Sequence, residues 1–341
     1  MKSRGELMVT KNAYEELADM LITDPTGAPE MKTPEFIQHL RLQYTPREAR
    51  LAVQVSLAGG KLDELAEKTG IEKGKLKEIL QTMANKGTMW IDPGKEDPNY
   101  RALGLAGPGI SETAFWAGVK NADTVTMAKL WNKWKYLWVR HGMGKLGFPL
   151  APVWPAWAVL PDNALPSENI AELIKQNDHW SISSCPCRFG HWIDDPGHHC
   201  RHMLETCLHM GDVSRWCVEH GMAREITCDE AIEIMRKSNE DGLVTTCYPN
   251  AVICGCCRDC CPFFIGINEM GLKLLQRSNF VSQINEETCS ACKTCAERCP
   301  VRAIEVDDFA VVDGELCIGC GVCVPTCKTE SAKLVRRPEE Q

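Results

Sequence analysis

The chain has 341 residues, which is enough for two or three domains with hydrophobic cores of their own. Hydrophobic residues make up 44% of the chain and charged residues 25%, a composition typical of a folded globular protein and not of a disordered segment. The formal net charge of −8 argues against a protein that coats nucleic acid or an anionic membrane surface.

The sequence predicts neither a membrane span nor secretion. The longest apolar stretch, 148–161, contains four prolines, and a spanning helix does not tolerate so many. The N-terminal segment lacks the apolar core of a secretory signal. We therefore expect a cytoplasmic protein.

Residues 45–106 predict three short helices followed by a pair of strands. Thr45-Pro46-Arg47-Glu48 has the pattern of a capping box with proline at the first helical position. Apolar residues then recur at helical spacing over 62–66 and 76–83, and Asp92-Pro93-Gly94 separates two strands within 88–103.

This order of elements resembles a winged helix-turn-helix domain, which we place at 45–122 after an N-terminal helical extension at 1–44. The candidate recognition helix, 72–86, is only mildly basic, with four lysines against two glutamates. DNA binding is one interpretation. A structural role or the formation of a homo-oligomer is the one we favour, because the chain as a whole is acidic.

Three tryptophans, Trp131, Trp134 and Trp138, recur at helical spacing at the start of a predicted middle domain, 123–280. A buried helix face is the interpretation we favour. The alternative is an exposed aromatic patch that docks a partner protein.

All 20 cysteines lie in the second half of the chain. Residues 1–184 contain none, 12 lie between Cys185 and Cys261, and 8 lie between Cys289 and Cys327. A disulfide-bonded protein is usually small and secreted and spreads its cysteines through the fold. The dense CxC and CxxC clusters therefore favour metal or cluster ligation.

Nine cysteines of the middle domain are candidate ligands. Cys254, Cys257 and Cys260 share a CxxCxxC spacing, and the adjacent Cys256 and Cys257 point in different directions on extended chain, which suits two neighbouring clusters. The complete set is Cys185, Cys187, Cys200, Cys207, Cys254, Cys256, Cys257, Cys260 and Cys261. Cys200 and Cys207 are seven residues apart, so we expect them on one face of a helix.

Nine candidates exceed by one the eight ligands of two clusters. We favour two 4Fe–4S clusters in this domain; one cluster, and zinc or mixed ligation, are the alternatives. Four histidines keep mixed ligation open, although we expect them to surround the site: His198, His199, His202 and His209. Cys217, Cys228 and Cys247 are interpreted as non-ligands, because free cysteine is a common small buried residue.

The C-terminal segment contains two copies of a CxxCxxCxxxC motif. Each cysteine of the first copy, which begins at Cys289, has a counterpart 28 positions later, and this indicates an internal duplication. Two-residue spacers let three thiolates on one tight loop reach three corners of an iron–sulfur cube, and the fourth ligand comes from elsewhere.

This segment, 281–341, resembles a bacterial-type ferredoxin with two 4Fe–4S clusters and a duplicated βαβ fold. The resemblance implies that Cys289, Cys292, Cys295 and Cys327 hold one cluster. It implies that Cys317, Cys320, Cys323 and Cys299 hold the other. Lys328 replaces the usual proline after the last cysteine, and a cation there would raise the potential of the nearer cluster.

The whole chain resembles anaerobe iron–sulfur proteins that join a winged-helix start to a CPCR and CxCC middle and a ferredoxin end. Where members of that group have further cysteines after CxCC, this chain has Arg258 and Asp259. The overall fold class that we predict is α+β.

We therefore expect an electron-transfer subunit that passes single electrons through 4Fe–4S clusters to or from a partner oxidoreductase complex in anaerobic metabolism. No nucleotide-binding or hydrolytic motif is present. One alternative is a reductase with an open cluster in the middle domain and Arg188 or His191 as proton donor. The other is a redox-sensing regulator that binds DNA.

Overall fold

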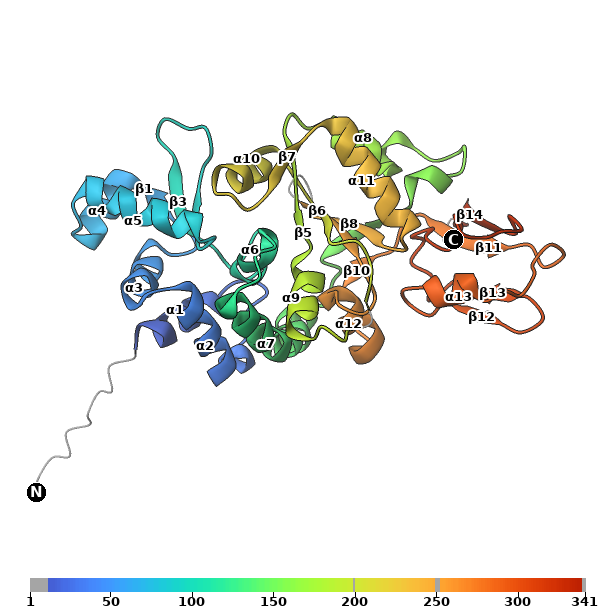
Figure 1. The fold of residues 1–341 in the computed structure, drawn as a ribbon, viewed down its shortest axis with the longest axis horizontal. Helices are drawn as coiled ribbons and strands as arrows, with labels where there is room; N and C mark the ends of the chain where they lie inside the picture. Colours follow the sequence, from blue (N-terminus) through green and yellow to red (C-terminus); the bar gives the residue numbers. More distant parts are fainter. Residues whose placement is uncertain (1–11, 199, 249–251, 339–341) are drawn as a thin grey trace, which may run out of the picture.

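The computed structural model describes residues 12–198, 200–248 and 252–338. Helices and a small sheet form the N-terminal part, a seven-stranded sheet forms the centre, and two short two-stranded sheets lie at the C-terminal end (Figure 1). The mixture of helix and sheet agrees with the predicted α+β class.

The N-terminal part contains the three helices and the strand pair expected within 45–106. Its helices are α1 (Ala13–Leu21), α2 (Pro34–Gln43), α3 (Pro46–Val55), α4 (Leu62–Thr69) and α5 (Lys73–Asn85). Its strands are β1 (Gly60–Lys61), β2 (Met89–Ile91) and β3 (Asn99–Ala102), in the antiparallel order β1-β3-β2. The predicted capping box of α3 is present, since the Glu48 carboxylate accepts the Thr45 N–H at 2.7 Å.

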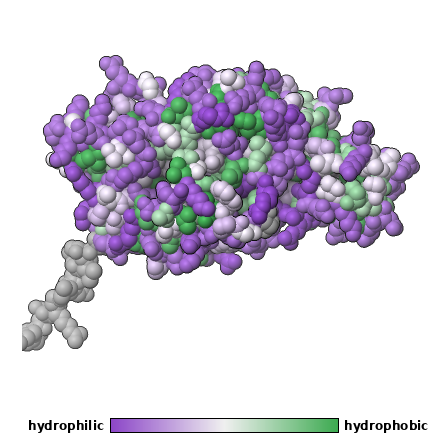
Figure 2. Space-filling view, viewed as in Figure 1, coloured by the Kyte–Doolittle hydropathy of each residue, from purple (hydrophilic) through white to green (hydrophobic). Residues whose placement is uncertain are grey.

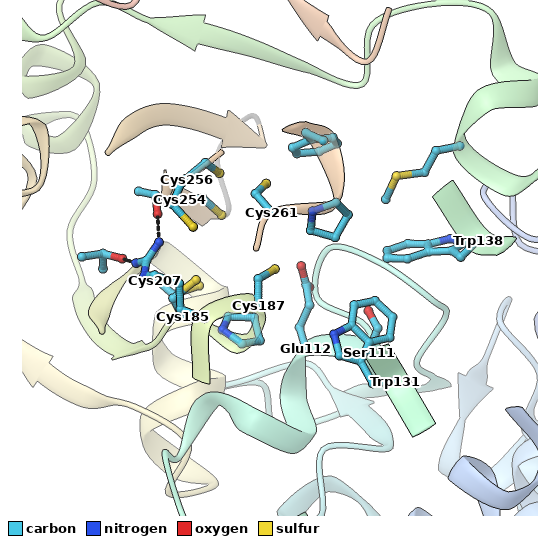
Figure 3. Close-up of a pocket in the computed structure, with 18 residues that line it drawn as sticks. Ser111, Glu112, Trp131, Trp138, Cys185, Cys187, Cys207, Cys254, Cys256 and Cys261 are labelled. Atoms are coloured by element: carbon cyan, nitrogen blue, oxygen red, sulfur yellow. Dashed lines mark hydrogen bonds between the residues drawn. The ribbon is translucent and has the colours of Figure 1, made fainter. Parts of the chain in front are cut away.

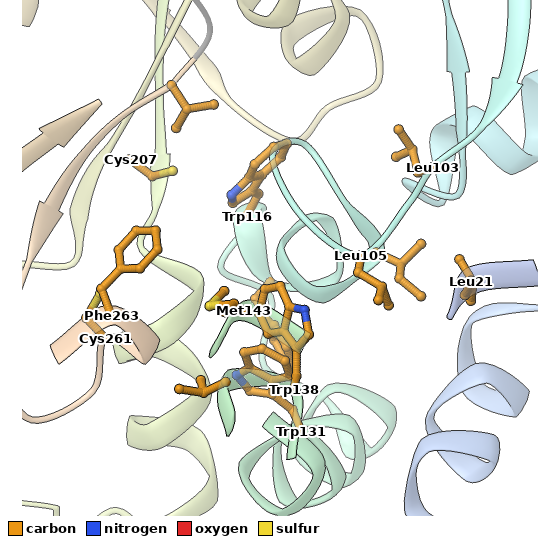
Figure 4. Packing of buried hydrophobic residues seen from close by; sticks show 14 of the residues in the cluster. Leu21, Leu103, Leu105, Trp116, Trp131, Trp138, Met143, Cys207, Cys261 and Phe263 are labelled. Atoms are coloured by element: carbon orange, nitrogen blue, oxygen red, sulfur yellow. The ribbon is translucent and has the colours of Figure 1, made fainter. Parts of the chain in front are cut away.

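Two further helices, α6 (Ile110–Trp116) and α7 (Ala122–Leu137), connect the N-terminal part to the centre. The three tryptophans at helical spacing are all buried, which confirms the buried-face interpretation. Trp131 and Trp134 meet edge to face at 4.6 Å, and Phe36 of α2 packs on Trp134 at 4.9 Å. Figure 4 shows Trp131 and Trp138 in the same core as Cys261 and Phe263, so this core reaches the cysteine-rich region.

The central sheet has the order β10-β4-β8-β9-β6-β5-β7. Its strands are β4 (Ala151–Trp154), β5 (Trp180–Ser184), β6 (Glu205–Met210), β7 (Arg224–Ile226), β8 (Val244–Tyr248), β9 (Val252–Cys256) and β10 (Leu275–Gln276). All neighbouring strands are antiparallel except β10 and β4. The helices of this part are α8 (Ile170–Lys175), α9 (Pro186–Asp194), α10 (Gly211–Glu219), α11 (Cys228–Glu240) and α12 (Pro262–Met270).

The two faces of this sheet differ in chemistry because side chains alternate along each strand. Ile182, Leu208, Cys247 and Ile253 share an apolar core with residues of α8 and α11. Cys207, Cys254 and Cys256 belong instead to the core that continues toward α6 and α7. One face of the sheet is therefore an ordinary core, and the other face presents thiols.

The prediction that Cys200 and Cys207 share a helix is wrong. Cys207 lies in β6, and Cys200 lies in the irregular segment before it. The segment from Glu205 alternates toward and away from the thiol face, and it pairs with β9 along its length. Pairing with a strand some 45 residues away outweighs a helical spacing that only two cysteines supported.

Short helical turns complete the connections: η1 (Pro29–Met31), η2 (Trp138–Met143), η3 (Gly144–Leu146), η4 (Trp157–Val159) and η5 (Pro166–Glu168). The C-terminal end contains α13 (Thr294–Arg298) and the strands β11 (Phe280–Ile284), β12 (Ile304–Val306), β13 (Ala310–Val312) and β14 (Ala332–Arg336). β11 pairs with β14, and β12 pairs with β13.

Most of the face seen in Figure 2 is hydrophilic, and apolar residues gather over the middle of the molecule. Among the helices of the described ranges, none combines the length and the apolar character that crossing a membrane requires.

Candidate iron–sulfur sites

Four cysteines of the C-terminal segment surround one hollow, which we call the outer site: Cys289, Cys292, Cys295 and Cys327. The hollow has an empty volume of about 340 Å³. Backbone N–H groups of Ala310 and Ala332 donate to the sulfurs of Cys289 and Cys327, each at 3.4 Å. Although burial opposes the thiolate, hydrogen bonding from Ser331 and Ala332 lowers the pKa of Cys327 to about 7.

The other four surround a second hollow of about 310 Å³, which we call the inner site: Cys299, Cys317, Cys320 and Cys323. All four are buried. Burial raises the pKa of Cys323 to about 12, even though the Ser282 hydroxyl lies 3.3 Å from its sulfur. Thiolates this deeply buried require a compensating positive charge, and iron would supply it.

The two cysteine loops have matching backbone conformations. Ala291 and Lys293 of the first loop have positive φ, as do their counterparts Gly319 and Gly321 in the second. The glycine is required at 319, because a Cβ there would lie 2.2 Å from the Phe280 carbonyl oxygen. The second loop therefore packs tightly against β11, whereas the first is open enough for side chains.

The two sites differ in their access to solvent. Cys292 of the outer site is exposed, while the inner site faces the central part of the molecule. The Ala156 N–H donates to the Cys320 carbonyl at 2.9 Å, and Val159 lies within 3.1 Å of where a Gly321 Cβ would be. The outer site is thus the one that another protein can approach.

A third hollow lies on the thiol face of the central sheet (Figure 3), and seven cysteines line it: Cys185, Cys187, Cys207, Cys254, Cys256, Cys257 and Cys261. Its empty volume of about 640 Å³ is close to that of the inner and outer hollows together. The two remaining candidates, Cys200 and Cys260, lie beside Cys257. The fold therefore gathers all nine candidates in one region.

Four of these thiols form a group that the sheet positions. Cys207 of β6 lies directly opposite Cys254 of β9, and Cys256 shares a face with Cys254 because they are two residues apart. Hydrogen bonding with Cys207 and Cys256 raises the pKa of the Cys254 thiol well above its usual value. Hydrogen bonding with Cys254 and Cys261 lowers the pKa of Cys256 well below its usual value. We call these four residues the sheet group.

Three further thiols form a second group, which we call the loop group. The sulfurs of Cys200, Cys257 and Cys260 lie within 4.8 Å of one another, and those of Cys200 and Cys257 are 3.9 Å apart. The CxxCxxC spacing pointed instead to Cys254 as the partner of Cys257 and Cys260. Cys254 lies inside β9, however, and the strand directs it toward Cys207.

The remaining pair, Cys185 and Cys187, lies at the beginning of α9. Cys185 is the N-cap of α9 and Cys261 is the N-cap of α12, and a proline follows each of them. A helix N-terminus favours negative charge, so both positions suit thiolates. Cys187 also packs against the core that contains Cys257 and Cys260.

Arg188 is the buried cation of this region, with 2% of its surface exposed. Its guanidinium donates to the Met203 carbonyl at 3.1 Å and to the Gly255 carbonyl at 2.6 Å, and it also bonds to the Thr206 hydroxyl. Burial opposes its charge, but the nearby thiolates of Cys185 and Cys257 raise its pKa above the usual value. Arg188 therefore both balances thiolate charge and ties the α9 start to β6 and β9.

We expect Arg188→Lys to lose the irons of the middle hollow while it keeps those of the inner and outer sites. A lysine keeps the charge but not the fork of donors that three separate acceptors require. Iron analysis of the anaerobically purified variant should give about half the wild-type content. A wild-type iron content in this variant would contradict the structural role of the guanidinium.

Two ionisable residues of this region were not predicted from the sequence. Glu112 of α6 directs its carboxyl group into the hollow (Figure 3), where burial raises its pKa to about 7 although the Gly107 N–H donates to it at 3.2 Å. Lys135 of α7 is fully buried, and burial lowers its pKa to about 8 against the opposing effect of Cys187. No motif surrounds either residue, so only the tertiary fold identifies them.

The predicted non-ligands lie apart from the hollow. Cys247 belongs to the apolar core on the opposite face of the sheet, and Cys228 begins α11. Buried Cys217 lies 3.6 Å from Nδ1 of His209, whose pKa burial lowers to about 3.

The predicted histidines surround the cysteines in different ways. His202 lies 3.1 Å from the Asp241 carboxylate, and Nδ1 of His198 accepts the Cys200 N–H at 3.2 Å. His209 bonds to Ser183 at 2.9 Å. His199 lies outside the described residues.

Comparison with known proteins identifies the C-terminal segment. Residues 282–305 match the 4Fe-4S binding domain family. Over 55 residues, the chain is 40% identical to a subunit of the ion-translocating oxidoreductase complex of Methanosarcina acetivorans, which is 16% of this chain and 21% of that protein. Over 56 residues it is 38% identical to ferredoxin-1 of Caulobacter vibrioides, which is 16% of this chain and 50% of that protein. No solved structure matches the chain significantly.

The chain thus contains a ferredoxin-type 4Fe–4S domain near its C-terminus, and these matches point to iron–sulfur electron transfer. They span half or less of the length of the curated relatives.

Proposed function

We propose that this protein carries four 4Fe–4S clusters and passes single electrons between a partner oxidoreductase and its own middle domain. The observation that carries the proposal is the arrangement of two four-cysteine hollows in the ferredoxin-type segment beside a larger hollow with seven cysteines. Iron–sulfur clusters bound by thiolates are one-electron carriers.

The ligand sets follow from the thiol groups. The outer and inner sites each supply four cysteines to one cluster. In the middle domain, the sheet group (Cys207, Cys254, Cys256 and Cys261) supplies four ligands to a third cluster. The loop group (Cys200, Cys257 and Cys260) supplies three to a fourth, and we assign Cys187 as its fourth ligand because Cys187 packs against Cys257 and Cys260. Cys185 then remains as a neighbour.

A route for electrons links these sites in one direction along the molecule. The outer site meets solvent at Cys292, and the inner site packs on the central part. The turn after α11 follows, where Asp241 accepts the Met203 N–H at 2.9 Å and Leu243 packs against Cys257 and Cys260. The loop group is therefore the first middle site that an electron from the ferredoxin-type segment meets, and the sheet group lies beyond it.

The N-terminal part has a structural role in this proposal. Its order of helix, strand, two helices and two strands supports a winged-helix assignment for 45–122. From the same segment, α6 directs Glu112 into the cysteine hollow, so this part completes the wall of the middle site. Because exposed cluster ligands oxidise readily, we place the protein in an oxygen-poor cytoplasm.

Anaerobic iron and sulfide analysis tests the proposal. We expect about sixteen irons and as many sulfides per chain, from four cubes with four irons each. Electron paramagnetic resonance of the reduced protein should show several interacting clusters. About eight irons would overturn the assignment of the middle domain, and bound zinc without sulfide would overturn electron transfer through it.

A further inference from the structure

A fourth hollow opens at the surface beside the loop group. It has an empty volume of about 510 Å³, and its lining consists of Arg188, Trp192, His198, Cys200, Arg201, His202 and Leu204. Cys200 brings an edge of the loop group to this hollow, because its sulfur lies 3.9 Å from that of Cys257. A ligand in the hollow would therefore lie beside the cluster that we assign to Cys200, Cys257 and Cys260.

The lining of this hollow is basic in a protein that is acidic overall. Two arginines and two histidines contribute to it, and no aspartate or glutamate does within the described part of the chain. The Asp241 carboxylate, which contacts the lining from outside, is engaged with His202 at 3.1 Å and with the Met203 N–H at 2.9 Å. A hollow with this lining attracts anions from a surface whose net charge repels them.

Arg201 is the exposed cation of the hollow. Its Nη1 donates to the Cys200 carbonyl at 3.1 Å and to the His198 carbonyl, so its own loop fixes the guanidinium at the rim. The opposite wall is the indole of Trp192, which is 45% exposed and lies 5.5 Å from the Lys120 ammonium. A planar donor fork facing an exposed ring suits a small ligand with a carboxylate or another oxyanion.

We propose that this hollow is a binding site for a small carboxylate or oxyanion, held by Arg201 at the edge of the loop group. The inference rests on the proposed function in one respect, namely that iron at Cys200 places the anion next to a redox centre. The site would make the loop group the place where the electron route of this protein meets a small molecule.

Isothermal titration calorimetry on the anaerobic, iron-loaded protein tests the site with three probes: acetate, inorganic phosphate and neutral acetamide. We expect the two anions to bind and acetamide to bind at least tenfold more weakly. Arg201→Gln should raise the Kd of the anions at least tenfold, which corresponds to about 1.4 kcal/mol. Lys120→Gln, which leaves the Cys200 loop intact, should raise it to a smaller extent.

The control is Arg224→Gln, an exposed arginine that pairs with Glu230 away from the hollow, and it should leave the Kd unchanged. Equal affinity for acetate and acetamide, or an unchanged Kd in Arg201→Gln, would overturn the anion site. Anion binding should also change the paramagnetic resonance signal of one cluster, and an unchanged signal at saturation would overturn its position beside the loop group. An iron content of about eight would overturn the proposed function and leave the calorimetric result to stand by itself.

Discussion

Replacing Cys207 by alanine is expected to remove about four irons per chain, whereas replacing Cys247 by alanine is expected to remove none. Both cysteines are buried, with 3% and 2% of their surfaces exposed, and both lie in strands of the central sheet. They differ in the face they occupy. Cys207 lies opposite Cys254 on the thiol face, and Cys247 lies opposite Ile253 in the apolar core. Packing losses should therefore be similar, and only Cys207→Ala removes a ligand.

Iron and sulfide analysis after anaerobic purification measures this difference, and circular dichroism checks that both variants keep the fold. The signals of the ferredoxin-type clusters should persist in Cys207→Ala, because the inner and outer sites have complete ligand sets of their own. Equal iron contents in the two variants would show that the sheet group holds no cluster. A loss of all iron from Cys207→Ala would show that its effect is on folding.

The ferredoxin-type segment could be predicted from the sequence because most of its ligands are local. Three cysteines of each site lie within seven residues, on a loop whose conformation the spacing itself constrains. The fourth ligand followed from the duplication, and the structure brings each predicted set of four around its own hollow. The helices of 45–85 were predicted for a similar reason, since caps and apolar spacing are local signals.

The middle domain could be predicted only as a list of candidates, because its groups depend on long-range pairing. The contact of Cys207 with Cys254 arises when β6 pairs with β9, and a helical spacing suggested a different structure for Cys207. The choice of Cys200 over Cys254 in the loop group likewise depends on where β9 ends. Glu112 reaches the hollow from a helix over 70 residues before the first cysteine, so no local motif could have identified it.

Replacing Arg298 by alanine is expected to slow electron exchange between the inner site and the middle domain at least tenfold, with the iron content unchanged. Arg298 lies between ligands of the outer and inner sites, Cys295 and Cys299. Its Nε donates to the Val322 carbonyl at 3.0 Å, inside the inner-site loop. Its Nη2 donates to the carbonyls of Asn239 and Glu240, at 3.1 and 2.9 Å. One guanidinium thus connects the inner site to the C-terminal end of α11.

The size of the expected effect follows from these contacts. A cation at a helix C-terminus is favourable, and hydrogen bonds to a charged group contribute about 1.5–3 kcal/mol each. The loss of even one of them shifts the ratio of docked to undocked ferredoxin-type segment by at least about tenfold. The turn that Arg298 holds leads directly to Asp241 and Leu243, which contact the loop group.

Lys333→Ala is the matched control, since Lys333 is an exposed cation on β14 of the same segment. Hydrogen exchange should increase at the end of α11 and around Val322 in Arg298→Ala and stay unchanged in Lys333→Ala. Rapid-freeze paramagnetic resonance after reduction through the outer site measures the exchange itself. If electrons reach the middle clusters of Arg298→Ala at the wild-type rate while hydrogen exchange increases, the route does not pass through this turn.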